Sequence, residues 1–368
     1  MTFQRSFRYH ALPMQVTFEV GAVAGVGDEL ARLGLRRALV LCTPEQRSLA
    51  ELVVDHLGDR GAGIFDQARM HVPVETADQA RVRARELGAD SCVVIGGGSS
   101  IGLGKAIALE HGLPIIAVPT TYAGSEMTPI WGLTRDGRKQ TGRDPVVLPQ
   151  AVIYDPALTT TLPAEISAAS GLNAVAHAVE ALYAPDASPI ISLMAEEGVR
   201  AFTAALPTIV EDGTDLEARA QALYGAWLCG SCLGATTMSL HHKLCHVLGG
   251  SLDLPHAQTH AVVLPYVLAY NESHAPRARE ALQRALGTEQ DPSVALWDLA
   301  QQLKIPHSLR ELGVDESHLP AIVDEVVSRP YSNPVPVTAE GLRHLLDGAL
   351  NGHRPTGPMT GAPSAHPI

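Results

Sequence analysis

The amino-terminal part of the chain alternates short apolar runs with helical patterns, and this alternation limits the folds open to it. Over about the first 150 residues, the strand-like runs cover residues 37–42, 63–65, 91–95 and 114–119. The intervening helical patterns cover residues 44–57, 77–88 and 99–111. Strands that are apolar throughout and separated by helices are typical of a mostly parallel sheet covered on both faces. We therefore predict a doubly wound α/β domain.

After Asp155 and Pro156 the character of the sequence changes. Patterns of Ala, Leu and Glu dominate from residue 163 to about residue 352, and β-rich runs are nearly absent, so an all-helical domain is predicted. The 368-residue chain is expected to divide into an α/β domain (residues 1–156), a helical domain (157–352) and a disordered tail (353–368). A cleft between two such domains is the natural place for a binding site.

Composition and charge exclude several classes of protein. Hydrophobic residues make up 46% of the chain and charged residues 18%, which fits a compact globular enzyme. The formal net charge of −12 argues against nucleic-acid binding, which needs clustered Lys and Arg. The apolar runs are too short to span a bilayer, and the first residues lack the apolar core of a secretion signal. A cytoplasmic location is therefore expected.

The cysteines indicate a reducing environment. Five of them, an odd number, lie inside apolar stretches, so they are interpreted as buried, reduced thiols. Cys229 and Cys232 have the spacing of a redox or zinc motif, but their surroundings resemble a helix interior and no second pair follows. The five are Cys42, Cys92, Cys229, Cys232 and Cys245.

A glycine turn, Gly96-Gly97-Gly98-Ser99, joins a predicted strand to a predicted helix. Glycines there let backbone N–H groups approach a pyrophosphate, and the helix N-terminus adds partial positive charge. It is not a Walker A loop, because Ala106 stands where a magnesium-binding Ser or Thr is required. The next strand ends in a hydroxyl-rich segment, residues 119–126, and neighbouring strand ends are where a doubly wound sheet binds its ligand. The two ends together favour a dinucleotide, and a purely structural turn is the alternative.

The end of the strand at residues 37–42 bears on which dinucleotide is used. An acidic residue there would favour the free 2′-hydroxyl of NAD, but Thr43 and Pro44 occupy the position. Arg47 could meet a 2′-phosphate, or could be an ordinary solvated residue at a helix start. We predict that both NADH and NADPH are used.

A histidine cluster lies in the predicted helical half, where five of the 16 histidines fall within residues 241–260. His242 and His246 are four apart, so on a helix they share a face. Gly249-Gly250 is expected to end that helix, and a second short helix follows. The two helices could aim imidazoles, which bind metals and carry protons near neutral pH, into one pocket. A chance cluster of surface histidines is the alternative. The five are His241, His242, His246, His256 and His260.

Together these motifs resemble the iron-containing alcohol dehydrogenase superfamily, and within it the sequence is similar to the maleylacetate reductases. The resemblance runs from about residue 7 to residue 333 and includes Asn173-x3-His177 and His242-x3-His246-x9-His256. It implies a dehydroquinate synthase-like fold, with an α/β dinucleotide-binding domain and an all-helical domain, in a homodimer. The strings that carry it are GGGSSIGLGKAIAL (96–109), PTTYAGSEMTPIWGLT (119–134), GLNAVAHAVEALYA (171–184) and HHKLCHVLGGSLDLPHAQTHAVVLP (241–265).

The resemblance also implies a reaction, the NAD(P)H-dependent reduction of maleylacetate to 3-oxoadipate in bacterial breakdown of aromatic compounds. Lys139 would reach the cofactor ribose. The other residues implied to touch the cofactor are Gly97, Gly98, Ser99, Thr120, Thr121 and Ser125.

Metal-using relatives hold their ion with one Asp and two or three His, and this chain departs from that pattern. Asn173 stands at the Asp position, whereas His177, His242 and His256 are kept. An amide oxygen supplies no charge to offset Fe²⁺ or Zn²⁺, although three imidazoles can bind zinc in principle. We expect no metal, as the resemblance implies. The alternatives are a metal-dependent alcohol dehydrogenase and a non-catalytic nucleotide sensor.

Reduction of a C=C bond conjugated to a ketone yields an enolate that needs a hydrogen-bond donor and then a proton on carbon. His246 is our candidate for the proton donor. The other histidines, partly protonated, are expected to attract the two carboxylates. The candidate substrate-binding residues are Tyr122, Asn173, His177, His242, His256 and His260.

Overall fold

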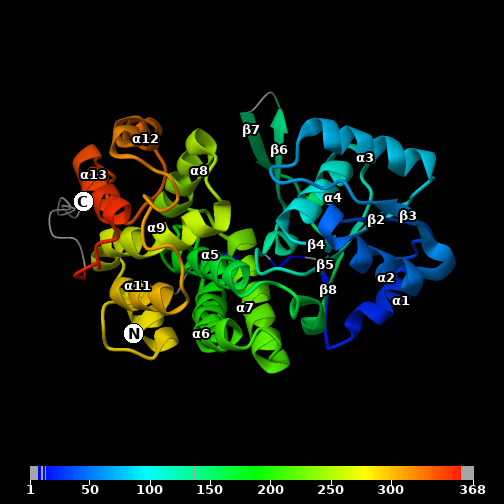
Figure 1. Cartoon of the computed structure of the whole chain (residues 1–368), viewed down its shortest axis with the longest axis horizontal. Coiled ribbons are helices and arrows are strands. Elements are labelled where there is room, and N and C mark those ends of the chain that lie inside the picture. Colours follow the sequence, from blue (N-terminus) through cyan, green and yellow to red (C-terminus); the bar gives the residue numbers. More distant parts are fainter. Residues whose placement is uncertain (1–6, 10, 13, 136–137, 358–368) are drawn as a thin grey trace. The chain divides into compact units, whose positions relative to one another are not determined.

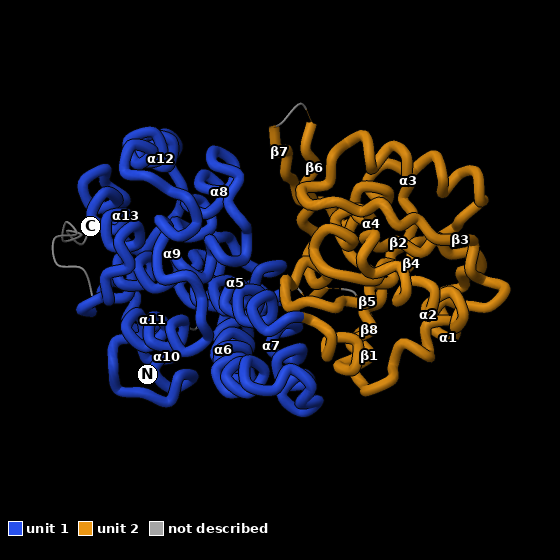
Figure 2. Tube along the Cα trace, in the orientation of Figure 1, with its two compact units in different colours: residues 1–10, 163–368 blue, residues 11–162 orange. Residues whose placement is uncertain are grey.

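The computed structural model describes residues 7–9, 11–12, 14–135 and 138–357, and it divides into two compact units. One unit comprises residues 11–162, and the other comprises the described residues from Pro163 onward together with residues 7–9 (Figure 2). The boundary therefore lies slightly later than the predicted position at residue 156. Among the described residues, no helix is long and apolar enough to cross a membrane.

The side chain of Asp155 explains why the boundary is shifted. Its carboxylate accepts hydrogen bonds from the backbone N–H groups of Gly21 (2.9 Å) and Val23 (3.2 Å). It also caps the 3₁₀ turn η6 (Pro156–Thr159) by accepting from the N–H of Ala157 at 3.1 Å. These bonds keep the segment after residue 156 with the α/β unit.

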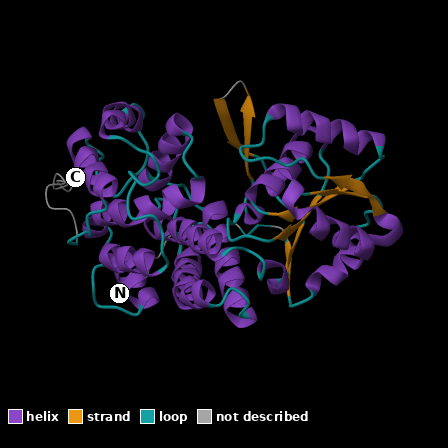
Figure 3. Ribbon diagram, in the orientation of Figure 1, coloured by secondary structure: helices purple, strands orange, loops and turns teal. Residues whose placement is uncertain are grey.

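The α/β unit contains a six-stranded sheet in the order β1-β8-β5-β4-β2-β3, and every pairing is parallel (Figures 1 and 3). The predicted parallel sheet is thus confirmed, with β1 at one edge. The strands are β1 (Gln15–Phe18), β2 (Ala38–Leu41), β3 (Gly61–Phe65), β4 (Ser91–Gly96), β5 (Ile115–Pro119) and β8 (Ala151–Tyr154).

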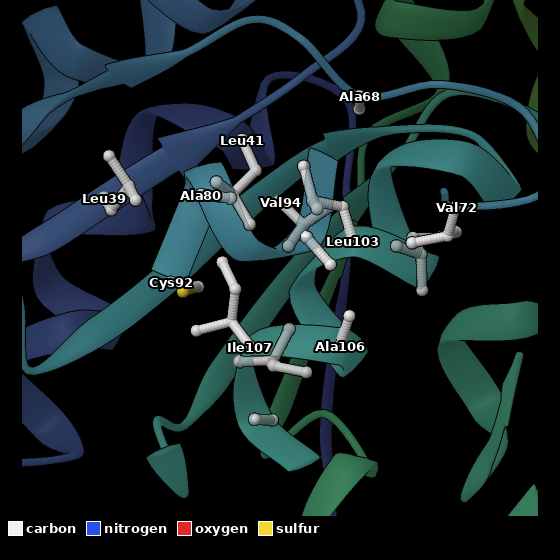
Figure 4. Close-up of a cluster of buried hydrophobic side chains, with 14 of the residues drawn as sticks. Leu39, Leu41, Ala68, Val72, Ala80, Cys92, Val94, Leu103, Ala106 and Ile107 are labelled. Atoms are coloured by element: carbon white, nitrogen blue, oxygen red, sulfur yellow. The ribbon is translucent and has the colours of Figure 1, made fainter. Parts of the chain in front are cut away.

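Helices cover the sheet because alternate residues of its inner strands point to opposite faces and both sets are apolar. Leu39 and Leu41 of β2 pack in one cluster with Ile107 (Figure 4), whereas Val40 packs with Leu30 in a separate cluster. Burying each such side chain contributes about 1.5–3 kcal/mol. The helices of this unit are α1 (Val26–Arg32), α2 (Arg47–Leu57), α3 (Val74–Glu86) and α4 (Gly98–His111).

Beside this sheet, β6 (Ile130–Arg135) and β7 (Arg138–Arg143) form an antiparallel two-stranded ribbon. Lys139 lies on β7, in the strand predicted there, and is exposed.

The remaining short elements of the two units are 3₁₀ turns: η1 (Ala22–Gly25), η2 (Pro44–Gln46), η3 (Gly58–Arg60), η4 (Ser125–Met127), η5 (Pro145–Val147), η7 (Glu272–His274) and η8 (Glu316–His318).

Among its described residues, the second unit contains helices joined by loops and no strand, as predicted (Figure 3). Side-chain caps explain several helix starts: Ser188, Asp215 and Thr338 each accept a backbone N–H from the first turn. The helices are α5 (Ala164–Tyr183), α6 (Pro189–Glu211), α7 (Leu216–Ala235), α8 (Leu240–Leu252), α9 (His256–Asn271), α10 (Pro276–Leu286), α11 (Pro292–Gln302), α12 (Leu319–Val327) and α13 (Ala339–Asn351).

Two details of the predicted helices are wrong. The helix carrying His242 does not end at Gly249-Gly250 but continues to Leu252, because the turn of direction occurs at Asp253, which has a left-handed φ of 52°. The following helix, α9, is not short, since it runs for 16 residues and is buried along most of its length. It therefore belongs to the core of the unit.

The predicted tail is wrong in its first part. Arg354 forms an ion pair with Asp298 at 2.6 Å and lies over the ring of Trp297, and Pro355 and Gly357 are buried. These contacts anchor residues 353–357 on the helical unit. The rest of the predicted tail, residues 358–368, lies outside the described residues.

Candidate active site

In the α/β unit, the glycine turn forms an open backbone cradle at the start of α4. Gly97 is the N-cap and Gly98 the first helical residue. A Cβ at Gly97 would lie 2.8 Å from Thr121 Cγ2, so packing requires glycine there. A Cβ at Gly98 would meet nothing within 4 Å, and the residue is exposed. This open space at the N-terminus of a long helix fits a pyrophosphate.

The ends of three neighbouring strands meet at this cradle. Gly96 at the end of β4 pairs with Pro119 at the end of β5, and the N–H of Thr120 donates to the Gly96 carbonyl at 3.1 Å. Gln46, which follows β2, donates from Nε2 to Thr120 Oγ1 at 2.6 Å. Ser100 Oγ is buried without a partner. The structure thus brings the predicted cofactor residues Gly97, Gly98, Ser99, Thr120 and Thr121 together, and adds Gln46 and Ser100, which the sequence analysis missed.

Lys105 holds the segment that carries Ser125. Its ammonium is buried and donates to the carbonyls of Ser125 (2.7 Å), Thr128 (2.8 Å) and Ile130 (2.8 Å). Burial lowers the pKa of Lys105 to about 7, and the neighbouring Glu126 carboxyl opposes this shift. This lysine was missed, although a single charge inside the apolar helix 101–109 was a signal for it.

Arg47, predicted to influence the choice of dinucleotide, is already paired with acidic side chains. Arg47 forms ion pairs with Asp66 (2.6 Å) and with Glu51 (3.0 Å). Its guanidinium is therefore neutralised locally, and a 2′-phosphate would have to compete with two carboxylates. Thr43 is the N-cap residue of η2 beside it.

In the helical unit, three helices bring the predicted substrate-binding residues together. Tyr122 is the exception, since it is buried in the α/β unit. Ring centroids lie 5.2 Å apart for His177 and His242, 5.1 Å for His242 and His260, and 4.3 Å for His256 and His260. Asn173 and His177 come from α5, His242 and His246 from α8, and His256 and His260 from α9.

Several polar atoms of this cluster are buried and have no hydrogen-bond partner. A buried polar atom left unpaired costs about 1–3 kcal/mol. Their convergence on adjacent helices therefore indicates a place for a polar ligand. His246 and His256, by contrast, are exposed, with ring centroids 6.5 Å apart. The unpaired atoms are Asn173 Oδ1, His177 Nδ1, His242 Nε2 and His260 Nε2.

Glu180 orients His242 and was missed by the sequence analysis. Its buried carboxylate lies 2.7 Å from His242 Nδ1 and accepts the backbone N–H groups of Ser239 and His241, each at 2.8 Å. Burial alone would raise the pKa of Glu180, but these hydrogen bonds and the nearby imidazoles lower it overall. The carboxylate is thus ionised at the N-terminus of α8, and the proton on His242 Nδ1 leaves Nε2 to face a ligand.

The expectation of a partly protonated cluster is wrong for His177, His241 and His260. Burial, with the neighbouring histidines, lowers the pKa values of His177 and His260 well below the usual value. Burial also lowers the pKa of His241 to about 3. These rings are neutral at pH 7, so they can donate one N–H each but supply no positive charge.

The positions at which metal-using relatives hold their ion do not fit a firmly bound Fe²⁺ here. They are Asn173, His177, His242 and His256, and none of these side chains is anionic. The nearby carboxylate, Glu180, already accepts three hydrogen bonds. A divalent ion at this position would gain no negative charge from its own ligands, which is unfavourable in a partly buried setting.

Comparison with known proteins identifies the family. The family described as iron-containing alcohol dehydrogenase matches residues 13–156, and the C-terminal part of the Fe-containing alcohol dehydrogenase family matches residues 167–350. The maleylacetate reductase of Burkholderia cepacia is 53% identical over 351 residues, which is 95% of this chain and 99% of that protein. That of Sphingobium indicum is 54% identical over 349 residues, covering 95% of this chain and 99% of that protein.

The solved structure of maleylacetate reductase from Agrobacterium tumefaciens superposes with a TM-score of 0.93 at 50% identity, covering 96% of this chain and 100% of that one. The predicted family and fold are therefore confirmed. The chain belongs to the iron-containing alcohol dehydrogenase family and is an oxidoreductase.

Proposed function

We propose that the protein reduces the C=C bond of maleylacetate with NADH or NADPH, giving 3-oxoadipate in bacterial degradation of aromatic compounds. Relatives about half identical over nearly the whole chain carry the name maleylacetate reductase. The observation in the structure that carries the proposal is the set of unpaired, buried imidazole and amide atoms on α5, α8 and α9. A substrate with two carboxylates and a ketone offers hydrogen-bond acceptors for the N–H groups of His177 and His260.

The α/β unit would bind the dinucleotide. Backbone N–H groups at the start of α4 would receive the pyrophosphate at Gly98, and the side chains of Ser99 and Thr121 would contact the rest of the nucleotide. Lys105 keeps Ser125 in place for this role. When bound, the cofactor supplies the hydride.

The helical unit would bind the substrate. His177 and His260 are neutral, so each can donate one N–H to a carboxylate or to the ketone oxygen. Glu180 holds the His242 ring through Nδ1, at 2.7 Å, so that Nε2 would face the substrate. The N–H groups of His177 and His260 would also stabilise the enolate oxygen as negative charge develops on it.

His246 would donate the proton to carbon. It lies one turn after His242 on α8, with ring centroids 6.2 Å apart. Because it is exposed, it can recover a proton from water after each turnover.

We propose that this reaction proceeds without a metal. The alternative function is a metal-dependent alcohol dehydrogenase. Two observations favour it: the family description names iron, and histidines are kept at positions 177, 242 and 256. Asn173 argues against that alternative, because an amide replaces the one anionic ligand.

The test is to mix the purified protein with NADH and maleylacetate, follow oxidation of NADH, and identify the product by mass spectrometry. Fast oxidation with formation of 3-oxoadipate is expected, with little turnover of simple aldehydes. Preferential reduction of aldehydes, dependent on added Fe²⁺ or Zn²⁺, would instead establish the alcohol dehydrogenase.

We also propose a homodimer, as the resemblance implies. The strand β1 lies at the edge of the sheet, where a second chain can add to it. Light scattering should give twice the 38.9 kDa mass of one chain, and a mass near 38.9 kDa would contradict the proposal.

A further inference from the structure

We propose that His241, Cys245 and His260 form a binding site for one thiophilic metal ion of the Zn²⁺ or Cu⁺ class. This site is separate from the position at which iron-containing relatives hold their ion. One ligand atom from each residue lies within 4.8 Å of the other two, and all three side chains are buried. The proposal does not depend on the proposed reaction, in which Cys245 has no part.

The geometry is close to that of a bound ion. His241 and Cys245 lie one turn apart on α8, with Cys245 Sγ 3.7 Å from His241 Nε2. His260, on α9, places Nδ1 3.0 Å from His241 Nε2. With Zn–N bonds of about 2.0 Å and Zn–S bonds of about 2.3 Å, tetrahedral ligand atoms lie roughly 3.3–3.6 Å apart. A small movement of Sγ toward His260 therefore completes the site.

The chemistry of the donors selects the metal. One thiolate and two imidazoles suit Zn²⁺ or Cu⁺ rather than Mg²⁺ or Ca²⁺, which prefer oxygen. Burial raises the pKa of the Cys245 thiol well above its usual value, so the metal-free protein carries S–H. On binding, the S–H bond breaks, a metal–sulfur bond forms and the proton leaves to solvent.

The charges around the site also favour a cation. Glu180 is ionised and accepts the backbone N–H of His241 at 2.8 Å. The Cys245 thiolate and this carboxylate together offset a divalent ion. The positions of Asn173, His177, His242 and His256 provide no anionic ligand. The family's iron position has thus lost its charge, whereas a sulfur-containing site is present beside it.

Binding also requires a change of tautomer. Without metal, one proton lies between His241 Nε2 and His260 Nδ1. With metal, both nitrogens present lone pairs, so His241 carries its proton on Nδ1 and His260 on Nε2. Both of these nitrogens are buried and unpaired, so the one hydrogen bond lost is that between His241 and His260, which two metal–nitrogen bonds replace.

The experiment titrates the full chain, freed of metal with EDTA, with Co²⁺ as a spectroscopic probe. A thiolate-to-cobalt charge-transfer band in the near ultraviolet is expected to saturate at one equivalent and to disappear when Zn²⁺ is added. Cobalt held by the imidazoles of His177, His242 and His256 would give no such band, so the band reports the thiolate alone.

Cysteine variants identify the residue that gives rise to the charge-transfer band. Cys245→Ser and Cys245→Ala should both lose it, and Cys229→Ala, which removes another buried thiol of the helical unit, should keep it. Circular dichroism and reductase activity should be retained in each variant. Absence of the band from the native protein, or its survival in the Cys245 variants, would overturn the proposal.

Discussion

The two candidate binding regions differ in which atoms do the binding. At the glycine turn the cradle is made of main chain, and side chains such as Gln46 and Lys105 are paired with protein groups. In the histidine cluster the binding atoms are side-chain nitrogens that are buried and unpaired. A main-chain site is specified by a short local sequence, whereas a side-chain site depends on helices that are far apart in the sequence. The first should control cofactor affinity, and the second should control turnover and protonation.

The largest effect is expected from His246→Ala in the histidine cluster. Loss of a positioned proton donor should lower kcat about 100-fold or more, with the dissociation constant of NADH unchanged. Stopped-flow and steady-state assays measure both quantities. The exposed His344 on α13 provides a matched control, since His344→Ala should leave kcat unaltered. Near-normal turnover in the His246 variant would rule out its role as proton donor.

Glu180→Gln should lower kcat about 10- to 100-fold, since a neutral amide would hold the His242 ring less firmly than the carboxylate that lies 2.7 Å from Nδ1. It should also lower the free energy of unfolding, because α8 loses a charge at its N-terminus. Glu272→Gln is the control: Glu272 is a buried carboxylate that accepts a hydrogen bond from the Ser293 hydroxyl at 2.6 Å. Denaturant unfolding should show a lower free energy of unfolding in both variants. Steady-state kinetics should show a lower kcat in Glu180→Gln only. Equal kinetics in the two would assign Glu180 a purely structural role.

At the glycine turn, Gly98→Ala should raise the KM for NADH about tenfold, which is about 1.4 kcal/mol. Its stability should be unchanged, because the new Cβ enters open space in the free protein. Gly97→Ala should lose both affinity and stability, since its Cβ would lie 2.8 Å from Thr121. An unchanged KM in Gly98→Ala would mean that the nucleotide binds elsewhere.

The buried histidines predict a pH dependence of stability. The pKa values of His177, His241 and His260 are lowered in the folded state, so the unfolded chain binds more protons below pH 6.5. These histidines therefore do not lower the free energy of unfolding above about pH 6.5. Below that pH, each lowers it by up to about 1.4 kcal/mol per pH unit. Denaturant unfolding between pH 7.5 and 5 measures the slope. His241→Gln should make it shallower, and an unchanged slope would contradict the lowered pKa of His241.

The smallest effect concerns the choice of cofactor. Asp66→Asn should raise kcat/KM for NADPH about fivefold or less, because an exposed ion pair with Arg47 contributes about 1 kcal/mol at most. The value for NADH should stay constant. Adding Arg47→Ala should cancel the gain, and a gain that persists in the double variant would exclude Arg47 as the phosphate ligand.

Much of the fold was predictable because it depends on local patterns. The apolar runs before Gly96 and Pro119 located β4 and β5, and the glycines between strand and helix located the cradle. The end of α8 was less predictable, since the helix continues past Gly249-Gly250 and ends at Asp253, which has a left-handed φ. The anchoring of Arg354 by Asp298 depends on a contact between distant segments, which no local pattern records.

The candidate site was predictable in its members but not in its protonation. The spacing of His242, His246 and His256 and the resemblance identified the cluster. The neutral state of His177 and His260 follows from their burial, which requires the packed helices. Glu180 could have been noticed as a lone acid in an apolar helix, but its bond to His242 joins residues 62 positions apart.

The most direct test of the account compares NADH oxidation with maleylacetate before and after exhaustive dialysis against EDTA, with metal content measured on the same samples. The account predicts equal kcat and KM in protein that retains far less than one metal ion per chain. Loss of turnover on dialysis, restored by Fe²⁺ or Zn²⁺, would contradict it.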